Sequence, residues 1–392
     1  MLLRYLLLAV AVLSLVACQS KDSKKLELKA ADLIKFEETV KVKKQWSRAA
    51  GSGQEKRFSR FVPALDGEGG IYTVGYKGDV QAFDATTGKK RWKVKTKAEI
   101  SGGVAASASG IYFGTYDGMV HVLNKDTGEL NWKAKVSSEV ASAPAGNSDI
   151  VVAVTIDGRV FAFEAETGAL RWSYDHTLPV LTLRGTASPV LTPTQVIVAF
   201  DNGQVLSLGA KDGSSQWQLR VSRPQGRTEL DRIVDIDGTP VLNGSYLYAG
   251  NYQGNVVAAS RGAGRLVWSK EASTHNAVVV ANNKVFVSTD ESRIVAYNAL
   301  NGELEWENFQ LKRRNTSAPA IFGDYLAVAD GYGYVHVLNQ DDGQFADRFK
   351  LAGGGKMRRA AIRAPLLGDG DTLYTYSNKG KLSAYTIVGE SK

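Results

Sequence analysis

The sequence of 392 residues contains one cysteine, Cys18, and only four histidines. A single cysteine excludes any disulfide within the chain and any site built from several thiolate ligands. None of the histidines, which are His121, His176, His275 and His336, has the His-x-x-x-His spacing of a common zinc site. The sequence also lacks a Gly-x-Ser-x-Gly nucleophile motif and a glycine-rich phosphate loop. It therefore predicts no metal site, no cofactor and no enzymatic activity.

Long apolar runs are scarce as well, and the clearest one is N-terminal. Residues 1–17 carry one early charge, Arg4, and an apolar run that ends in Ala17. This run is too short for a stable membrane span and is typical of a secretory signal peptide. The ending Leu-Val-Ala-Cys at 15–18 resembles the bacterial lipobox, in which the cysteine is lipidated and becomes the mature N-terminus. We therefore predict a signal peptide over residues 1–17 and lipidation at Cys18.

The residues after Cys18 predict where the protein is anchored. By resemblance to bacterial sorting signals, Gln19 in place of Asp favours the outer membrane over the inner membrane. Stable anchoring needs more than one acyl chain, and the triacyl modification of this class of lipoprotein supplies them. We expect residues 18–40 to form the lipidated N-terminus and a polar tether. The folded body would then face the periplasm.

Strong charge of one sign is also missing, because the net charge of +8 is spread along the chain. A basic balance can serve nucleic acid, anionic lipid or an acidic partner. The aromatic residues, however, are not interleaved with lysine and arginine as a groove for single-stranded nucleic acid requires. We interpret the charge as that of a mixed, soluble surface and expect no nucleic-acid partner.

Prolines are few, nine against forty glycines, and the glycines follow a repeat. The segment 120–132 ends in Thr-Gly-Glu-Leu-Asn-Trp, and related segments at 80–92 and 160–172 also end in Thr-Gly, three further residues and Trp. More divergent copies end at Trp217, Trp268 and Trp306. A self-similar unit of about 40 residues is the signature of a solenoid or a propeller. Turn signals divide each unit into four short strands, which is the pattern of a propeller blade.

The turn glycine before each tryptophan gives the number of blades. There are eight such glycines: Gly88, Gly128, Gly168, Gly213, Gly264, Gly302, Gly343 and Gly389. A tryptophan follows four residues after each of the first six, whereas the seventh position holds Asp347. The chain ends before the eighth unit can form a fourth strand, and the segment 42–46, which ends in Trp46, resembles the missing one.

These observations predict an all-β, eight-bladed propeller of four-stranded antiparallel blades over residues 41–392. The N-terminal strand would complete the last blade, because closing the ring removes a free sheet edge. All seven tryptophans would then occupy one structural position and wedge between neighbouring blades.

Two neighbouring repeats are longer than the two that precede them. The first two glycine intervals span 40 residues, whereas the next two span 45 and 51. Both additions fall between the last strand of one blade and the first strand of the next, so they should emerge on the same face. Departures from a regular scaffold are where function is commonly carried.

The two insertions carry the candidate binding residues. The first contains Leu181, Leu183 and Arg184, and the second contains Asp235 and Asp237. Exposed leucines beside opposite charges suit a protein-docking surface. Two other uses remain open: the two aspartates could hold a calcium ion, or they could pair with Arg184 and brace the adjacent loops.

The repeat itself resembles that of the pyrroloquinoline-quinone-type propellers, whose founding members are eight-bladed quinoprotein dehydrogenases. The resemblance implies a vicinal disulfide and a carboxylate-bound calcium in those enzymes, and a chain whose only cysteine is Cys18 cannot form that disulfide. A quinoprotein-like, metal-binding or sugar-binding periplasmic propeller is the alternative interpretation.

The insertions show a more specific resemblance. Leu-Thr-Leu-Arg-Gly at 181–185 and Thr-Glu-Leu-Asp-Arg-Ile-Val-Asp-Ile-Asp-Gly-Thr-Pro at 228–240 are similar to the corresponding loops of the BamB family. These are lipoproteins of the bacterial outer-membrane β-barrel assembly machinery, and the resemblance extends from the lipobox through all eight blades. This sequence differs from the family mainly in the tether and in residues 352–359, and it assigns no role to residues 352–359.

The resemblance implies a non-enzymatic scaffold that assists folding and insertion of β-barrel proteins into the outer membrane. Its partners would be the periplasmic POTRA region of BamA, other lipoproteins of the complex and unfolded outer-membrane proteins. Carried over residue by residue, the contact positions are Leu181, Leu183, Arg184, Asp235 and Asp237.

Overall fold

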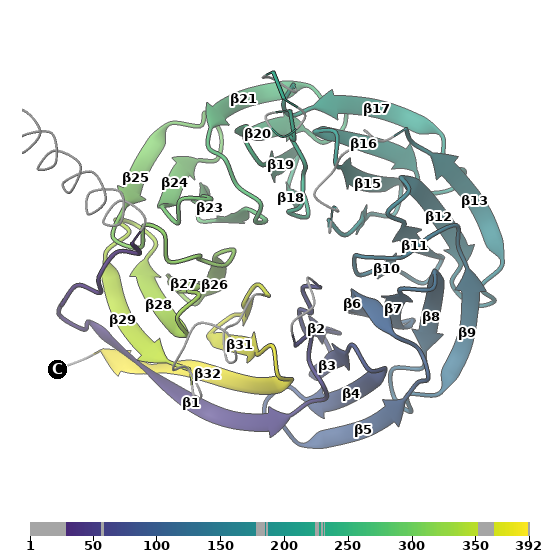
Figure 1. Ribbon diagram of the computed structural model, residues 1–392, viewed down its shortest axis with the longest axis horizontal. Helices are drawn as coiled ribbons and strands as arrows, with labels where there is room; N and C mark the ends of the chain where they lie inside the picture. The colour runs from purple at the N-terminus through teal and green to yellow at the C-terminus, as the bar shows by residue number, and fades with distance from the viewer. Residues whose placement is uncertain are drawn as a thin grey trace, which may run out of the picture.

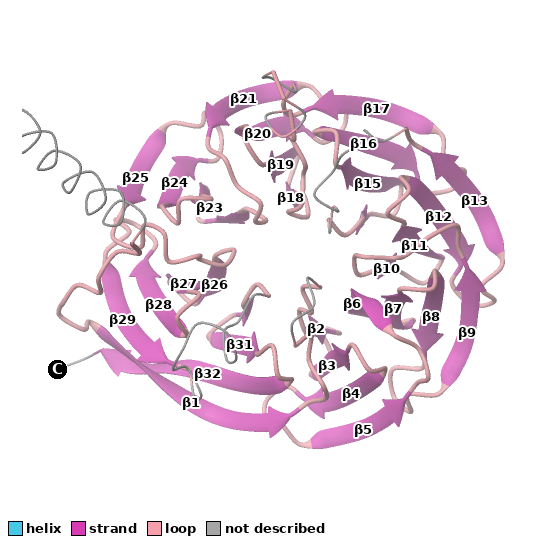
Figure 2. Cartoon of the chain, viewed as in Figure 1, coloured by secondary structure: helices cyan, strands magenta, loops and turns pink. Residues whose placement is uncertain are grey.

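The computed structural model describes residues 29–55, 59–177, 185, 187–223, 227, 228, 230, 232–351 and 364–390. In these ranges, 32 strands form eight four-stranded antiparallel sheets that are arranged as blades around a ring (Figure 1). Figure 2 shows strands, loops and turns in the described part, and no helix there is long and apolar enough to cross a membrane. The predicted all-β, eight-bladed propeller is confirmed.

Blades 1 to 4 each use four consecutive strands. Blade 1 consists of β2 (Ala64–Leu65), β3 (Gly70–Gly75), β4 (Asp79–Asp84) and β5 (Lys90–Lys95). Blade 2 consists of β6 (Ile100–Ser107), β7 (Gly110–Thr115), β8 (Met119–Leu123) and β9 (Leu130–Lys135). Blade 3 consists of β10 (Ala145–Gly146), β11 (Ile150–Val154), β12 (Arg159–Glu164) and β13 (Leu170–Asp175). Blade 4 consists of β14 (Val190–Leu191), β15 (Gln195–Phe200), β16 (Gln204–Gly209) and β17 (Ser215–Arg220).

Blades 5 to 7 follow the same order, and blade 8 joins both ends of the chain. Blade 5 consists of β18 (Val241–Asn243), β19 (Tyr246–Gly250), β20 (Asn255–Ser260) and β21 (Leu266–Glu271). Blade 6 consists of β22 (Val279–Ala281), β23 (Lys284–Ser288), β24 (Ile294–Asn298) and β25 (Leu304–Asn308). Blade 7 consists of β26 (Ala320–Phe322), β27 (Tyr325–Ala329), β28 (Tyr334–Asn339) and β29 (Phe345–Lys350). Blade 8 consists of β30 (Leu367–Asp369), β31 (Thr372–Tyr376), β32 (Lys381–Glu390) and β1 (Val40–Ala49).

The position of a strand within its blade explains its composition. The second strand of blade 1, β3, is buried along its whole length, whereas the outer strand β5 alternates between exposed and half-buried residues. Second and third strands have a neighbouring blade on each face, so their residues are buried on both faces, as in β3 and β4. The core therefore consists of layers between blades and not of one central cluster.

Each tryptophan of an outer strand packs on the turn glycine of the following blade. Trp132 donates its indole N–H to the carbonyl of Ala165 at 2.8 Å. Gly168 has a φ of 72°, and a methyl group in place of its side-chain hydrogen would lie 2.6 Å from the Trp132 ring. The same contact joins Trp46 to Gly88, Trp92 to Gly128, Trp172 to Gly213, Trp217 to Gly264, Trp268 to Gly302 and Trp306 to Gly343. The predicted wedge between neighbouring blades is confirmed.

The ring closes as the sequence predicts. β1 pairs antiparallel with β32, and Trp46 lies opposite Ala384 beside the same bulge that the other outer strands have. Its indole N–H donates to the carbonyl of Ala85 at 3.1 Å. Gly389, in contrast, lies inside β32, so the prediction of an eighth turn at this glycine is wrong. Blade 8 needs no such turn because its outer strand comes from the other end of the chain.

Candidate partner-binding surface at blades 4 and 5

Both insertions lie where the repeat lengths place them. The first connects β13 of blade 3 to β14 of blade 4, and the second connects β17 of blade 4 to β18 of blade 5. Gly185 of the first insertion lines a small depression together with Ile156, which lies in the turn between β11 and β12. The first insertion thus emerges on the face that carries the turns between second and third strands. Leu181, Leu183 and Arg184 lie outside the described residues.

The second insertion returns into the core before β18 begins. Ile233, Val234 and Ile236 are buried, and Ile236 packs in the cluster between blades 4 and 5. Asp235 is fully buried between them, and its backbone carbonyl accepts a hydrogen bond from the N–H of Tyr252 at 3.0 Å. The carboxylate of Asp235 therefore faces the protein interior and acts on neighbouring chain segments.

Asp237 has a more open position than Asp235. It is half-buried and borders a cavity of about 270 Å³, together with Arg60 and with residues from the inner edges of other blades. Arg60 donates from its guanidinium to the backbone carbonyl of His275 at 3.1 Å, which links blade 1 to the segment before blade 6. The end of the second insertion thus reaches the inner side of the ring.

Hydrogen bonds fix the ends of both insertions. The N–H of Gly185 donates to the carboxylate of Asp201 at 3.0 Å, and the N–H of Ser188 donates to the hydroxyl of Thr239 at 3.0 Å. The second of these bonds joins the end of the first insertion to the end of the second. Two loops that are far apart in sequence therefore form one braced surface.

The first insertion starts at the half-buried His176. His176 stacks on Phe200 with ring centroids 4.2 Å apart, and its Nε2 lies 2.8 Å from the amide nitrogen of Asn202. Burial lowers the pKa of His176 below its ordinary value, although the contact with Asn202 acts in the opposite direction.

The sequence interpretation missed an exposed leucine on this surface. Leu230 is 67% exposed and is the most exposed of the large apolar side chains in the described part of the chain. It stands between Glu229 and Asp231, where an apolar residue among charges was a usable signal. Ile156 is a second exposed apolar residue, and it lies in a turn where a polar residue is more usual.

The geometry does not assemble a metal site from residues that can be described. Among them, no group of three or more His, Cys, Asp or Glu side chains is placed to hold a metal ion. A calcium ion needs six to eight oxygen ligands. Asp235 is enclosed by apolar neighbours on either side, which suits bracing better than coordination.

Comparison with known proteins agrees with this arrangement of blades and insertions. A family model described as outer membrane protein assembly factor BamB matches residues 76–308 and 256–392. The protein of that name from Pseudomonas aeruginosa is 47% identical over 381 residues, which cover 97% of this chain and 98% of the relative. The chain belongs to the BamB family.

Two further relatives extend the comparison. The BamB protein of Escherichia coli is 33% identical over 359 residues, which cover 89% of this chain and 91% of the relative. The crystal structure of BamB from Moraxella catarrhalis superposes with a TM-score of 0.78 at 26% identity, covering 88% of this chain and 99% of that chain.

The fold also occurs in enzymes. A quinohemoprotein alcohol dehydrogenase from Comamonas testosteroni superposes with a TM-score of 0.68 at 12% identity, covering 90% of this chain and 77% of that chain. At this identity the likeness is one of fold alone. Membership of a family of assembly factors confirms the prediction that the chain is not an enzyme.

Proposed function

We propose that this protein is a non-enzymatic scaffold of the outer-membrane β-barrel assembly complex, anchored by lipid at Cys18 and facing the periplasm. Its nearly full-length similarity to assembly factors of the BamB family carries this proposal. In that role it assists the folding and insertion of β-barrel proteins into the outer membrane.

The surface formed by the two insertions is the site that we assign to the partner, the periplasmic POTRA region of BamA. Leu181, Leu183 and Leu230 would supply apolar anchors, and Arg184 would set their orientation. Because Asp235 is fully buried, its part is to hold the second insertion in place and not to contact the partner directly.

Co-purification with BamA from detergent-solubilised outer membrane tests this assignment. We expect Leu183→Glu or Leu230→Glu to reduce the recovery of BamA about tenfold or more, because a charge would replace an apolar side chain that becomes buried on binding. The melting temperature should stay nearly unchanged. Leu130→Glu is the matched control, since Leu130 is exposed on β9 of blade 2 and should leave recovery intact. Full recovery with all three variants would contradict the assignment.

Asp235→Asn distinguishes bracing from docking. We expect this variant to lose thermal stability together with BamA binding, because Asp235 acts through the fold. If binding is lost while stability is unchanged, Asp235 contacts the partner itself.

The anchor has a separate test. Cys18→Ala should release the protein from the membrane fraction, since no acyl chain can then be attached. Retention of this variant in the outer membrane would contradict the proposed lipid anchor while leaving the docking surface untouched.

A further inference from the structure

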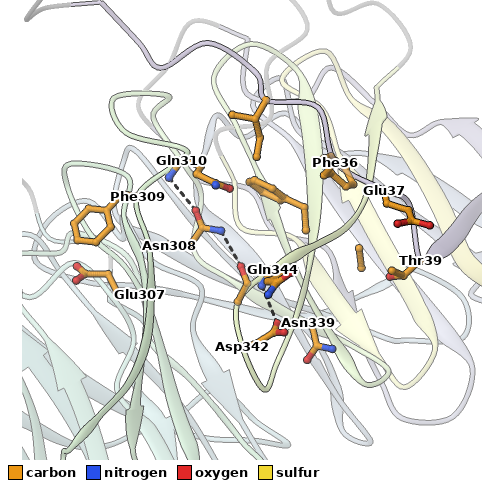
Figure 3. A pocket seen from close by; sticks show the side chains of 14 residues that line it. Phe36, Glu37, Thr39, Glu307, Asn308, Phe309, Gln310, Asn339, Asp342 and Gln344 are labelled. Carbon is orange, nitrogen blue, oxygen red and sulfur yellow. Dashed lines mark hydrogen bonds between the residues drawn. The ribbon is translucent and has the colours of Figure 1, made fainter.

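A groove with a volume of about 760 Å³ is lined by residues of blades 6 and 7 and of the N-terminal segment. The outer strands β25 and β29 of these blades lie in a different sector of the ring from blades 4 and 5, which flank the second insertion (Figure 1). The end of β25 and the following residues 307–310 form one wall (Figure 3). The N-terminal segment 34–39 forms the opposite wall, and the turn between β28 and β29 forms the floor. Ligand sites commonly enclose about 300–1,000 Å³.

The N-terminal wall is held in place by two arginines of blade 7. Arg314 donates to the carbonyl of Ala31 at 2.8 Å, and Arg348 donates to the carbonyl of Ile34 at 2.9 Å. The Arg348 guanidinium also lies 4.8 Å from the ring centroid of Phe36. The groove is thus formed before any ligand arrives, so binding has little ordering entropy to offset.

The floor is fixed in the same way. The side-chain amide of Asn308 donates to the carbonyl of Gly343 at 2.7 Å, and the N–H of Gln344 donates to the carboxylate of Asp342 at 2.9 Å (Figure 3). Because the first of these bonds joins blade 6 to blade 7, the width of the groove is set by the propeller itself.

Each wall of the groove carries an aromatic ring. Phe309 is 54% exposed on one wall, and Phe36 lies on the other (Figure 3). Each ring already has an arginine of this chain near it: the Arg293 guanidinium lies 5.8 Å from the Phe309 centroid, and that of Arg348 lies 4.8 Å from the Phe36 centroid. The cation–π contacts of both rings are thus made within the chain, and the exposed part of Phe309 remains open to apolar side chains of a ligand.

The rim of the groove is acidic although the chain as a whole is basic. Glu37 and Asp342 are exposed there, and within the described ranges neither carboxylate forms an ion pair. Glu307 differs, since Arg293 pairs with it at 2.5 Å. Two uncompensated carboxylates beside aromatic walls favour a ligand that is both cationic and apolar.

The N-terminal wall also offers unused backbone groups. Among the residues that the structure describes, the N–H and carbonyl groups of residues 35–38 make no hydrogen bond, whereas the N–H of Thr39 donates to the carbonyl of Ala346. An extended polypeptide can pair with such groups while its side chains enter pockets, and a small molecule cannot use both.

We propose that this groove binds an extended polypeptide segment that carries arginine or lysine next to apolar residues. The apolar side chains would contact Phe309, and the cationic side chains would meet Glu37 and Asp342. The inference rests on the groove alone and stands whether or not the insertions bind BamA.

Fluorescence anisotropy with a labelled peptide, Ser-Arg-Leu-Arg-Leu-Arg-Ser, tests the proposal on the folded mature chain. We expect saturable binding that weakens about tenfold in Phe309→Ala, as truncation of an anchor at the centre of a site does. The double variant Glu37→Gln with Asp342→Asn should weaken binding similarly and reduce its dependence on salt. Asn at 342 keeps an acceptor for the N–H of Gln344.

Matched controls lie on the same edge of blade 6. Leu304 is 57% exposed on β25 outside the groove, and Glu303 is an exposed carboxylate beside it. Leu304→Ala and Glu303→Gln should leave the affinity unchanged. The proposal is overturned if the peptide does not bind saturably, if the control variants weaken binding as much as Phe309→Ala, or if a peptide with glutamate in place of arginine binds equally well.

Discussion

The junctions between blades differ between the continuous part of the ring and the place where its ends meet. At seven junctions a tryptophan packs on the turn glycine of the next blade and donates to a carbonyl there, as Trp306 does to Gln340 at 2.8 Å. At the junction between blades 7 and 8, Asp347 takes the place of tryptophan. Its carboxylate accepts a hydrogen bond from the N–H of Val42 at 2.9 Å.

The reason for this difference is topological. An indole can wedge against a turn only if the next blade has one, and blade 8 has a continuous strand, β32, where Gly389 lies. Asp347 instead lies beside the N-terminal chain where this chain enters β1. Its carboxylate accepts from the backbone N–H of Val42 and takes the place of the indole ring. An indole wedge joins the other pairs of blades, whereas here a carboxylate binds the backbone of β1 beside an apolar cluster that blades 7 and 8 share.

The largest expected effect is at an apolar junction. Trp132→Ala should lower the free energy of unfolding by about 3–5 kcal/mol, because it removes a buried indole and its hydrogen bond to Ala165. Urea unfolding followed by circular dichroism measures it. Trp132→Phe keeps a ring and should cost much less. A loss below about 1 kcal/mol for Trp132→Ala would contradict the wedge.

The turn glycine gives the next effect. Gly168 has a positive φ and contacts the Trp132 ring, whereas Gly244 has a φ of 57° and no atom within 4 Å of the position of an added methyl group. Gly168→Ala should therefore cost about 1–3 kcal/mol more than Gly244→Ala, which carries the backbone strain alone. Equal losses in urea unfolding would mean that the ring contact contributes nothing.

The junction between blades 7 and 8, the closing junction, should lose less stability on substitution than the tryptophan junctions. Asp347→Ala leaves the partly buried N–H of Val42 without its acceptor, at a cost of about 1–2 kcal/mol. Asp347→Trp should not restore stability, because no glycine turn faces this position. Limited trypsin digestion near Lys41 reports the junction directly, and both variants should be cut faster than the wild type. If Asp347→Trp is more stable than the wild type, the topological explanation fails.

The sequence predicted the seven tryptophan junctions and did not predict the different contact at Asp347. Repeat spacing was enough to place the blades and the tryptophans, and the likeness of 42–46 to other outer strands predicted the closure. Asp347 could not be interpreted, because its partner Val42 is about 300 residues away and becomes a neighbour only after closure. Gly389 followed the repeat in sequence but not in structure.

The candidate surface shows a similar division. The interval lengths located both insertions, yet they gave no measure of burial, so Asp235 and Asp237 seemed equivalent when one is fully buried and the other is not. Leu230 was overlooked because only acidic residues of the second insertion were chosen as candidate binding residues. His336, considered from the sequence only as a metal ligand, lies in a buried network that only the fold brings together.

That network lies beneath the N-terminal segment in blade 7. His336 is fully buried, and its Nε2 lies 2.9 Å from the carboxylate of Asp330, which also accepts from Arg314 at 2.8 Å. Arg348 donates to Nδ1 of His336 at 3.1 Å. Since arginine can only donate, Nδ1 must accept, and the imidazole is neutral with its proton on Nε2. The rings of Tyr334 and Phe345 complete its surroundings.

The effect of His336 on stability is the smallest of these effects at neutral pH, and it becomes visible on acidification. Burial lowers the pKa of His336 below its ordinary value, against the opposing effect of Asp330, and Arg348 adds to the lowering. Below about pH 6.5 the unfolded chain then binds a proton that the folded chain refuses, so stability falls as the pH falls. Protonation would also set an N–H of the ring against the Arg348 donor.

His336→Gln removes this titration and should flatten the dependence on pH. We expect the urea midpoint of the wild type to fall more than that of His336→Gln between pH 7.5 and pH 5.5, with earlier trypsin cleavage at Lys29 and Lys35 in the acidified wild type. Trp132→Ala keeps His336 and its partners, so it should show the wild-type pH dependence at lower overall stability. Identical pH profiles for the wild type and His336→Gln would show that the closing junction is no more sensitive to acid than the rest of the ring.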